Sequence, residues 1–207
     1  EAKRAGIPVT AETCPHYLFL TDATIAKIGP FAKGNPPLRS RESMEKLWDY
    51  VRDGSVDYIG SDHSPFLLSE KEKGLKDIFT AAAGSPCVEM SLALMLTAVR
   101  DGKLTLKRCV ELMSENAARI FGLFPRKGIL AVGADADLVV VDMDKVWKVS
   151  NDDLVTHAKA IGTMYNGMEL IGRPVHTVVR GRIVMRDRKV DASAQGWGKC
   201  LTPEWSR

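Results

Sequence analysis

His16 and Asp62 are the two residues of this chain whose type and position best suit metal chemistry. His16 follows an apolar, β-branched run at residues 8–14, and Asp62 follows a similar run at residues 56–60. Active-site groups gather at the carboxyl ends of parallel strands, because the loops that follow them converge on one crevice. An imidazole and a carboxylate that meet there could bind zinc, manganese or iron.

The same two residues could also have purely structural roles. His16 could pack against Tyr17, and Asp62 could satisfy backbone groups of the turn that follows it. Most polar residues at strand ends do no more than this. Residue type alone does not separate the two interpretations.

Other catalytic patterns in the sequence are weaker. His157 lies in a helix-like segment at 153–160, and His176 lies in a short predicted strand. Cys14 is close to His16, but neighbouring residues of a strand point to opposite faces, and no third group completes a nucleophilic arrangement. No P-loop, GxSxG or GxGxxG pattern occurs in the sequence.

The elements that would position His16 and Asp62 alternate between strand and helix. Apolar residues at helical spacing predict helices at 21–28, 40–52, 88–99 and 105–121. Two prolines make residues 34–40 a rigid loop, and the polar stretch at 69–76 is typical of a mobile loop. This order favours parallel strands with helical crossovers, and therefore an α/β sheet or barrel.

From Gly128 onwards the pattern changes to short strands and turns. Strands are predicted at 138–141, 145–149 and 175–184, and Arg180-Gly181 breaks the last of them, as in an antiparallel hairpin. We therefore predict three parts: an α/β part at 1–125, a β part at 126–190 and a tail at 191–207. The tail contains Trp197 and Trp205 and has little periodicity.

Composition argues against several classes of function. The formal net charge is +3 with interspersed charges, so the basic face that nucleic-acid binding needs is missing. The longest apolar runs are far shorter than the roughly 20 residues that span a bilayer. The 4 cysteines lack CxxC spacing and predict reduced, buried thiols in a cytoplasmic protein. Because the chain opens without Met at an apparent helix end, we expect a fragment of a longer protein.

Five segments carry more specific information: ETCPHYL at 12–18, GNPPLRS at 34–40, DYIGSDHSP at 57–65, NAARIFGL at 116–123, and KG with GADADL between 127 and 138. In this order and spacing they resemble the carboxyl half of the cyclic amidohydrolases. That group comprises dihydroorotase, allantoinase and the hydantoinase/dihydropyrimidinase enzymes.

The resemblance implies the last part of a TIM-type barrel with two divalent metal ions, usually zinc, followed by part of a small β-sandwich. His16 would be the metal ligand after the sixth barrel strand. Asp62 would be the metal ligand after the eighth strand and the catalytic proton carrier. Asn35, after a seventh strand, and the backbone at Ala83 and Gly84 would bind the substrate. The remaining metal ligands would lie upstream of this sequence.

The implied reaction is the opening of a cyclic amide ring by metal-bound hydroxide, with hydantoin, dihydropyrimidine, allantoin or dihydroorotate as the substrate. Phe66 stands where dihydroorotases commonly carry a second His, which favours the other branches, whereas Asn35 favours dihydroorotase. Cys87 replaces a small Gly and could crowd the substrate. The full-length enzyme is expected to form a homo-oligomer. A non-catalytic scaffold of the same fold, which acts by oligomerising, is the alternative.

Overall fold

Two short strands bring the candidate site segments together. In the computed structural model, which describes residues 1–203, β1 (Glu12–Thr13) pairs in parallel with β2 (Tyr58–Ile59). Flanking backbone extends the pairing, because the N–H of Asp57 donates to Ala11 at 2.8 Å and that of Gly60 donates to Thr13 at 3.0 Å. Both strands are shorter than the predicted runs at 8–14 and 56–60, since each has only the other to pair with among the described residues.

The first helices follow β1 closely. They are α1 (Pro15–Phe19), α2 (Asp22–Ile28), the 3-10 helix η1 (Gly29–Ala32) and α3 (Arg41–Arg52). The hydroxyl of Ser40 accepts the N–H of Ser43 at 3.3 Å and caps α3, and the predicted apolar face of α3 is buried. The implied seventh strand before Asn35 is wrong for this structure, because η1 occupies that place and Pro30 cannot donate a ladder hydrogen bond.

The mobile loop predicted at 69–76 is also wrong. This segment forms α4 (Leu68–Glu72) and η2 (Lys73–Leu75), and η3 (Ile78–Thr80) follows. Lys71 anchors it: the side chain is fully buried and donates to three backbone carbonyl oxygens at 2.9 to 3.3 Å, those of Pro30, Lys33 and Ala82. A polar sequence gives no sign of this, because lysine is rarely buried unless it is paired.

The longer predicted helices are confirmed. Helix α5 (Val88–Arg100) is buried on most of its surface, and α6 (Leu106–Val110), the π-helical turn η4 (Glu111–Glu115) and α7 (Asn116–Ile120) run on from one to the next. Within residues 1–203, none of the helices combines the length and the apolar character that crossing a membrane requires.

The antiparallel sheet predicted after Gly128 is also confirmed. Its strands are β3 (Leu138–Lys148), β4 (Glu169–Val179), β5 (Arg182–Arg186) and β6 (Lys189–Val190), paired in chain order. The strands predicted at 138–141 and 145–149 are one strand with an irregularity after Asp142. Arg180 and Gly181, with φ of 47° and 77°, form the tight turn between β4 and β5.

The connection between β3 and β4 crosses over the amino-terminal end of α5. It contains two 3-10 helices, η5 (Asn151–Asp153) and η6 (Lys159–Ile161), so the helix-like segment predicted at 153–160 is wrong. Beyond β6, η7 (Ala192–Ala194) leads into a tail whose Trp197 indole N–H donates to the carbonyl of Val179 at 2.8 Å. Trp205 lies outside the described residues.

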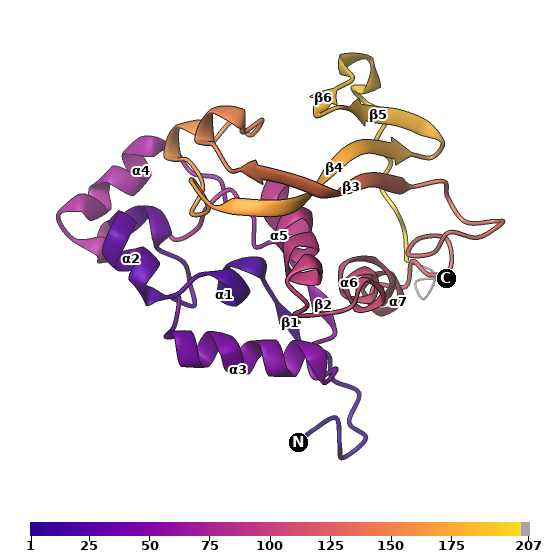
Figure 1. Ribbon diagram of the computed structural model, residues 1–207, viewed down its shortest axis with the longest axis horizontal. Helices are drawn as coiled ribbons and strands as arrows, with labels where there is room; N and C mark the ends of the chain where they lie inside the picture. The colour runs from indigo at the N-terminus through magenta and orange to yellow at the C-terminus, as the bar shows by residue number, and fades with distance from the viewer. Residues whose placement is uncertain (204–207) are drawn as a thin grey trace.

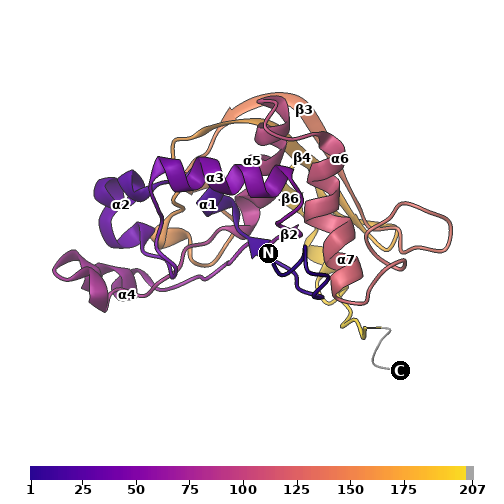
Figure 2. The same cartoon turned by 90° about the horizontal axis from the view of Figure 1, so that it is seen from below.

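Helix α5 is the central layer of the molecule. Figure 1 shows the antiparallel sheet on one side of α5 and α1 with α3 on the other; in Figure 2, seen from below, α3 overlaps α5. One buried cluster joins α5 to α3 through Trp48 and Met95, and a second joins it to the sheet through Leu94, Tyr165 and Leu170. The sheet therefore has a fixed position relative to the β1–β2 pair.

The Lys71 anchor gives a stability prediction. Lys71→Met keeps the bulk of the side chain but removes the donor to three backbone carbonyl groups, so we expect a loss of about 2–4 kcal/mol in the free energy of unfolding. Urea denaturation measures this difference. Lys73→Met, at an exposed position of the same segment, should change stability by less than about 0.5 kcal/mol. Equal denaturation midpoints for the two variants would contradict the anchor.

Candidate active site

His16 and Asp62 face each other where the parallel strand pair ends. The Nε2 atom of His16 lies 3.9 Å from an Oδ atom of Asp62, which is too long for a hydrogen bond. The His16 side chain is 5% exposed and that of Asp62 is 46% exposed. The convergence expected from two strand ends is therefore present, and the two polar groups are near each other without being bonded.

The surroundings of His16 favour a neutral imidazole. Pro15 begins helix α1, which places the His16 ring against the ring of Tyr17 with centroids 4.1 Å apart. Burial lowers the pKa of His16, and the charge of Asp62 only partly opposes this effect. The Nδ1 atom is buried and has no hydrogen-bond partner among residues 1–203. Packing against Tyr17 is thus real, but it leaves a buried polar atom unsatisfied.

Asp62 has an unusual backbone conformation. Its φ is +47°, in the left-handed region that aspartate tolerates better than most residues. Such conformations persist only where the surrounding structure holds them, and they cluster at functional sites. Asp62 lines the same crevice as His16, whereas His63 lines the groove between α5 and the antiparallel sheet.

The crevice around His16 and Asp62 is narrow. Its volume is about 10 Å³, room for about one water molecule and far below the few hundred Å³ of a typical small-molecule site. The other residues that line it are Ala32, Lys33, Gly34, Pro36, Leu38, Gly84, Ser85, Cys87 and Met164. The described residues therefore form one wall of a site rather than a complete pocket.

Only one of the three predicted substrate-binding residues lines the crevice. Gly84 lines the crevice, but Asn35 and Ala83 do not, although Gly34 and Pro36 on either side of Asn35 do. Asn35 is exposed. Met164 lines the crevice from the β3–β4 connection and was not expected, because a single methionine in a loop carries no sequence pattern that points to a site.

The cysteines near the crevice are poor nucleophiles. Burial, with the charge of Asp62, raises the pKa of Cys14 to about 12. Burial raises the pKa of Cys87 to about 11, although Cys87 lines the crevice. Three of the four cysteines are buried as predicted, and Cys200 is exposed.

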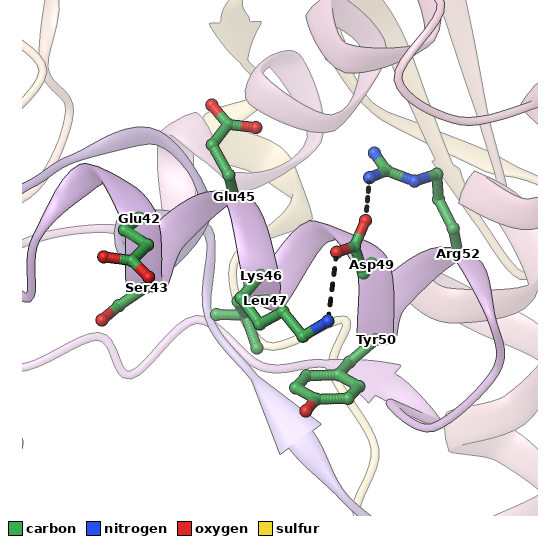
Figure 3. Close-up of a pocket in the computed structure, with 8 residues that line it drawn as sticks. All are labelled: Glu42, Ser43, Glu45, Lys46, Leu47, Asp49, Tyr50 and Arg52. Atoms are coloured by element: carbon green, nitrogen blue, oxygen red, sulfur yellow. Dashed lines mark hydrogen bonds and ion pairs between the residues drawn. The ribbon is translucent and has the colours of Figure 1, made fainter.

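The larger hollows lie elsewhere. One of about 830 Å³ is the open outer face of α3, shown in Figure 3, where Asp49 pairs with Lys46 at 3.7 Å and with Arg52 at 2.6 Å. All the side chains that line it come from this one helix, and the two ion pairs of Asp49 are the polar pairs drawn among them. A groove of about 660 Å³ lies between α5 and the antiparallel sheet.

His16 and Asp62 fit a metal site only as part of its ligand set. Residues 1–203 contain no group of three or more His, Cys, Asp or Glu side chains that could hold a metal ion. Catalytic zinc sites usually take three protein ligands. A neutral buried imidazole with an unsatisfied nitrogen, beside a carboxylate, has the right chemistry for two of them.

Comparison with known proteins agrees with this geometry. The profile described as the Amidohydrolase family matches residues 6–184. The chain belongs to the amidohydrolase family. Among curated relatives, this amidohydrolase chain is 39% identical over 203 residues to the L-hydantoinase of Paenarthrobacter aurescens, covering 98% of this chain and 44% of that protein. It is 41% identical over 187 residues to a dihydroorotase of Syntrophus aciditrophicus (strain SB), covering 90% and 42%.

Solved structures give the same result for the amidohydrolase chain. It matches the L-hydantoinase (dihydropyrimidinase) from Arthrobacter aurescens with a TM-score of 0.87 and 39% identity, over 92% of this chain and 42% of that one. It matches the D-hydantoinase (dihydropyrimidinase) from a Thermus species with a TM-score of 0.87 and 35% identity, over 96% and 43%. The chain thus spans less than half the length of these relatives.

The close contact at Gly84 gives a second prediction. A Cβ atom at Gly84 would lie 2.3 Å from the Cβ of Ser64 and 2.8 Å from the Phe66 ring, so Gly84→Ala must displace the Asp62 loop. We expect a stability loss of about 2–4 kcal/mol, measured by urea denaturation. Gly102→Ala is the matched control, because Gly102 also has a positive φ but open space around it, and it should cost about 1 kcal/mol. Equal losses would contradict the steric explanation.

Proposed function

We propose that the protein to which this chain belongs is a metal-dependent hydrolase that opens a cyclic amide ring. The observation that carries the proposal is the pair of a buried His16 and an Asp62 held at positive φ, which meet at the ends of two parallel strands. Family membership and the similarity to proteins named hydantoinase and dihydroorotase support it.

We propose the following architecture for the longer protein. The α/β part at 1–125 forms the last section of a TIM-type barrel, and the β part at 126–190 forms part of a β-sandwich. The parallel β1–β2 pair, with helices after each strand, supports the first assignment, and the four-stranded antiparallel sheet supports the second. Residues 191–207 form the tail, whose Trp197 contacts the β4–β5 hairpin.

In the proposed chemistry, His16 and Asp62 hold part of a pair of divalent metal ions, with zinc suited to this donor set and the other ligands outside residues 1–203. Such ions, when bound, activate a water molecule and polarise the amide carbonyl. Asp62 is the carboxylate in the crevice, so it takes the proton from the attacking water and returns it to the leaving amide nitrogen.

Part of the substrate-binding wall lies in the described residues. Gly84, which packs closely against Ser64, lines the crevice together with Gly34 and Pro36, and we assign Asn35, between these last two, and the backbone at Ala83 and Gly84 to substrate binding. The proposed substrate class is a cyclic amide or ureide, as in hydantoin, dihydropyrimidine, allantoin and dihydroorotate, and the relatives named hydantoinase and dihydroorotase support it. We also propose a cytoplasmic homo-oligomer as the assembled enzyme.

Substitutions of the two ligands test this function in the full-length enzyme. Asp62→Asn removes the proton carrier and should lower kcat by about 10²- to 10⁴-fold on a cyclic amide substrate. His16→Ala should lower the zinc content measured by elemental analysis. His157→Ala, at an exposed histidine outside the crevice, should change neither quantity.

The same experiment separates the enzyme from the non-catalytic scaffold. A wild-type protein that contains zinc and opens the ring supports the enzyme. Full metal content and near-native turnover in both ligand variants would contradict the site assignment. A wild-type protein without metal and without ring-opening activity would favour the scaffold.

A further inference from the structure

His63 follows Asp62 in the chain but does not line the crevice. It lines the groove between α5 and the antiparallel sheet, together with Val88 and Trp147. His63 is absent from the residues that line the crevice beside His16. Its role must be sought in its contacts on the α5 side.

The imidazole of His63 completes the amino-terminal end of α5. Its Nδ1 atom accepts the backbone N–H of Cys87 at 3.2 Å and that of Val88 at 3.3 Å. The first N–H groups of a helix have no partner within the helix, and the side chain of Cys87, at the N-cap position, does not supply one. The Nδ1 atom of His63 therefore acts as the acceptor for two N–H groups at the start of α5.

Backbone contacts continue this link along the loop. His63 forms a parallel bridge with Ser85, and the N–H of Ser64 donates to the Ser85 carbonyl at 3.2 Å. Gly84 fits directly against Ser64. Residues 63–64 therefore lie along residues 84–88, immediately after the strained backbone of Asp62.

Helix α5 provides a rigid support for this attachment. It contributes Met95 and Ala98 to the core shared with α3, and Met90 and Leu94 to the core shared with the sheet. A loop tied to the end of such a helix has little freedom to move. The φ of +47° at Asp62 needs this kind of external restraint.

We propose that His63 is a positioning residue, which sets the Asp62 carboxylate toward His16 by tying the loop to the amino terminus of α5. This inference rests on the proposed function, because it assigns Asp62 to metal binding and proton transfer. Partners that orient metal ligands from outside the coordination shell typically account for 10- to 100-fold in metal affinity or activity. We expect an effect of about that size here.

Three substitutions of His63 distinguish the effect of losing the hydrogen-bond acceptor from the effect of changing the size of the side chain. In His63→Asn, the amide oxygen takes the place of Nδ1 and can still accept from Cys87 and Val88. In His63→Gln the oxygen lies one bond further out, and in His63→Leu the acceptor is lost. His157→Leu, at an exposed histidine of the same groove, is the matched control.

The first measurement is the zinc dissociation constant of the full-length enzyme, by competition with a chromophoric chelator. We expect His63→Leu to weaken zinc binding by about 10- to 100-fold, while His63→Asn stays within about threefold of wild type. His63→Gln should resemble His63→Leu, and His157→Leu should equal wild type. Because Asn and Gln are both polar and differ by one methylene, their comparison holds even if the Leu variant fails to fold.

The second measurement does not depend on the metal. Hydrogen exchange at the amides of Cys87 and Val88 should become at least about tenfold faster in His63→Gln and His63→Leu, but not in His63→Asn, because exchange requires the hydrogen bond to open. If His63→Leu or His63→Gln keeps wild-type zinc affinity while its amide exchange is fast, the positioning role is overturned. A His63→Asn variant that loses zinc as fully as His63→Leu would overturn it as well. A wild-type enzyme that binds no zinc would overturn the proposed function instead, while the exchange data still report on the attachment.

Discussion

The parallel pairing of β1 with β2 is the constraint on which the site depends. Asp57 stabilises it from the side, because its carboxylate accepts the N–H of Ala11 at 2.7 Å and pairs with Lys3 at 2.5 Å. The side-chain amide of Asn116 donates to the Asp57 carbonyl at 2.8 Å and joins the strand pair to α7. A register slip of one residue would move one strand by about 3.3 Å and separate His16 from Asp62.

Helix α5 connects the strand pair and the Asp62 loop to the β part of the molecule. Its first turn receives the Asp62 loop through His63, and Glu89 in the same turn accepts the N–H groups of Val155 and Thr156 at 2.9 to 3.2 Å. That second attachment holds the β3–β4 connection, which places Met164 on the crevice wall. The β part is therefore a structural component of the site, even though a composition change near residue 125 suggests a separate unit.

The elements that could be predicted are those whose sequence signals lie within a few neighbouring residues. Helices α3 and α5 follow from apolar spacing, and the β4–β5 turn follows from Arg180-Gly181, because these signals lie within a few residues. Helix α4 could not be predicted, since its stability depends on Lys71 reaching carbonyl groups far away in sequence. The short β1 and β2 strands differ from prediction for the same reason, because strand length depends on the neighbours available for pairing.

The sequence by itself determined the chemical types of the site: an imidazole and a carboxylate, each after a strand, in segments that match the amidohydrolase family. Only the tertiary structure decided which side chains reach the crevice. Asp62 lines the crevice while its neighbour His63 lines the groove beside α5, Asn35 stays outside, and Met164 comes from a distant loop. Side-chain direction at such positions is set by long-range packing and hydrogen bonds, which residue spacing does not encode.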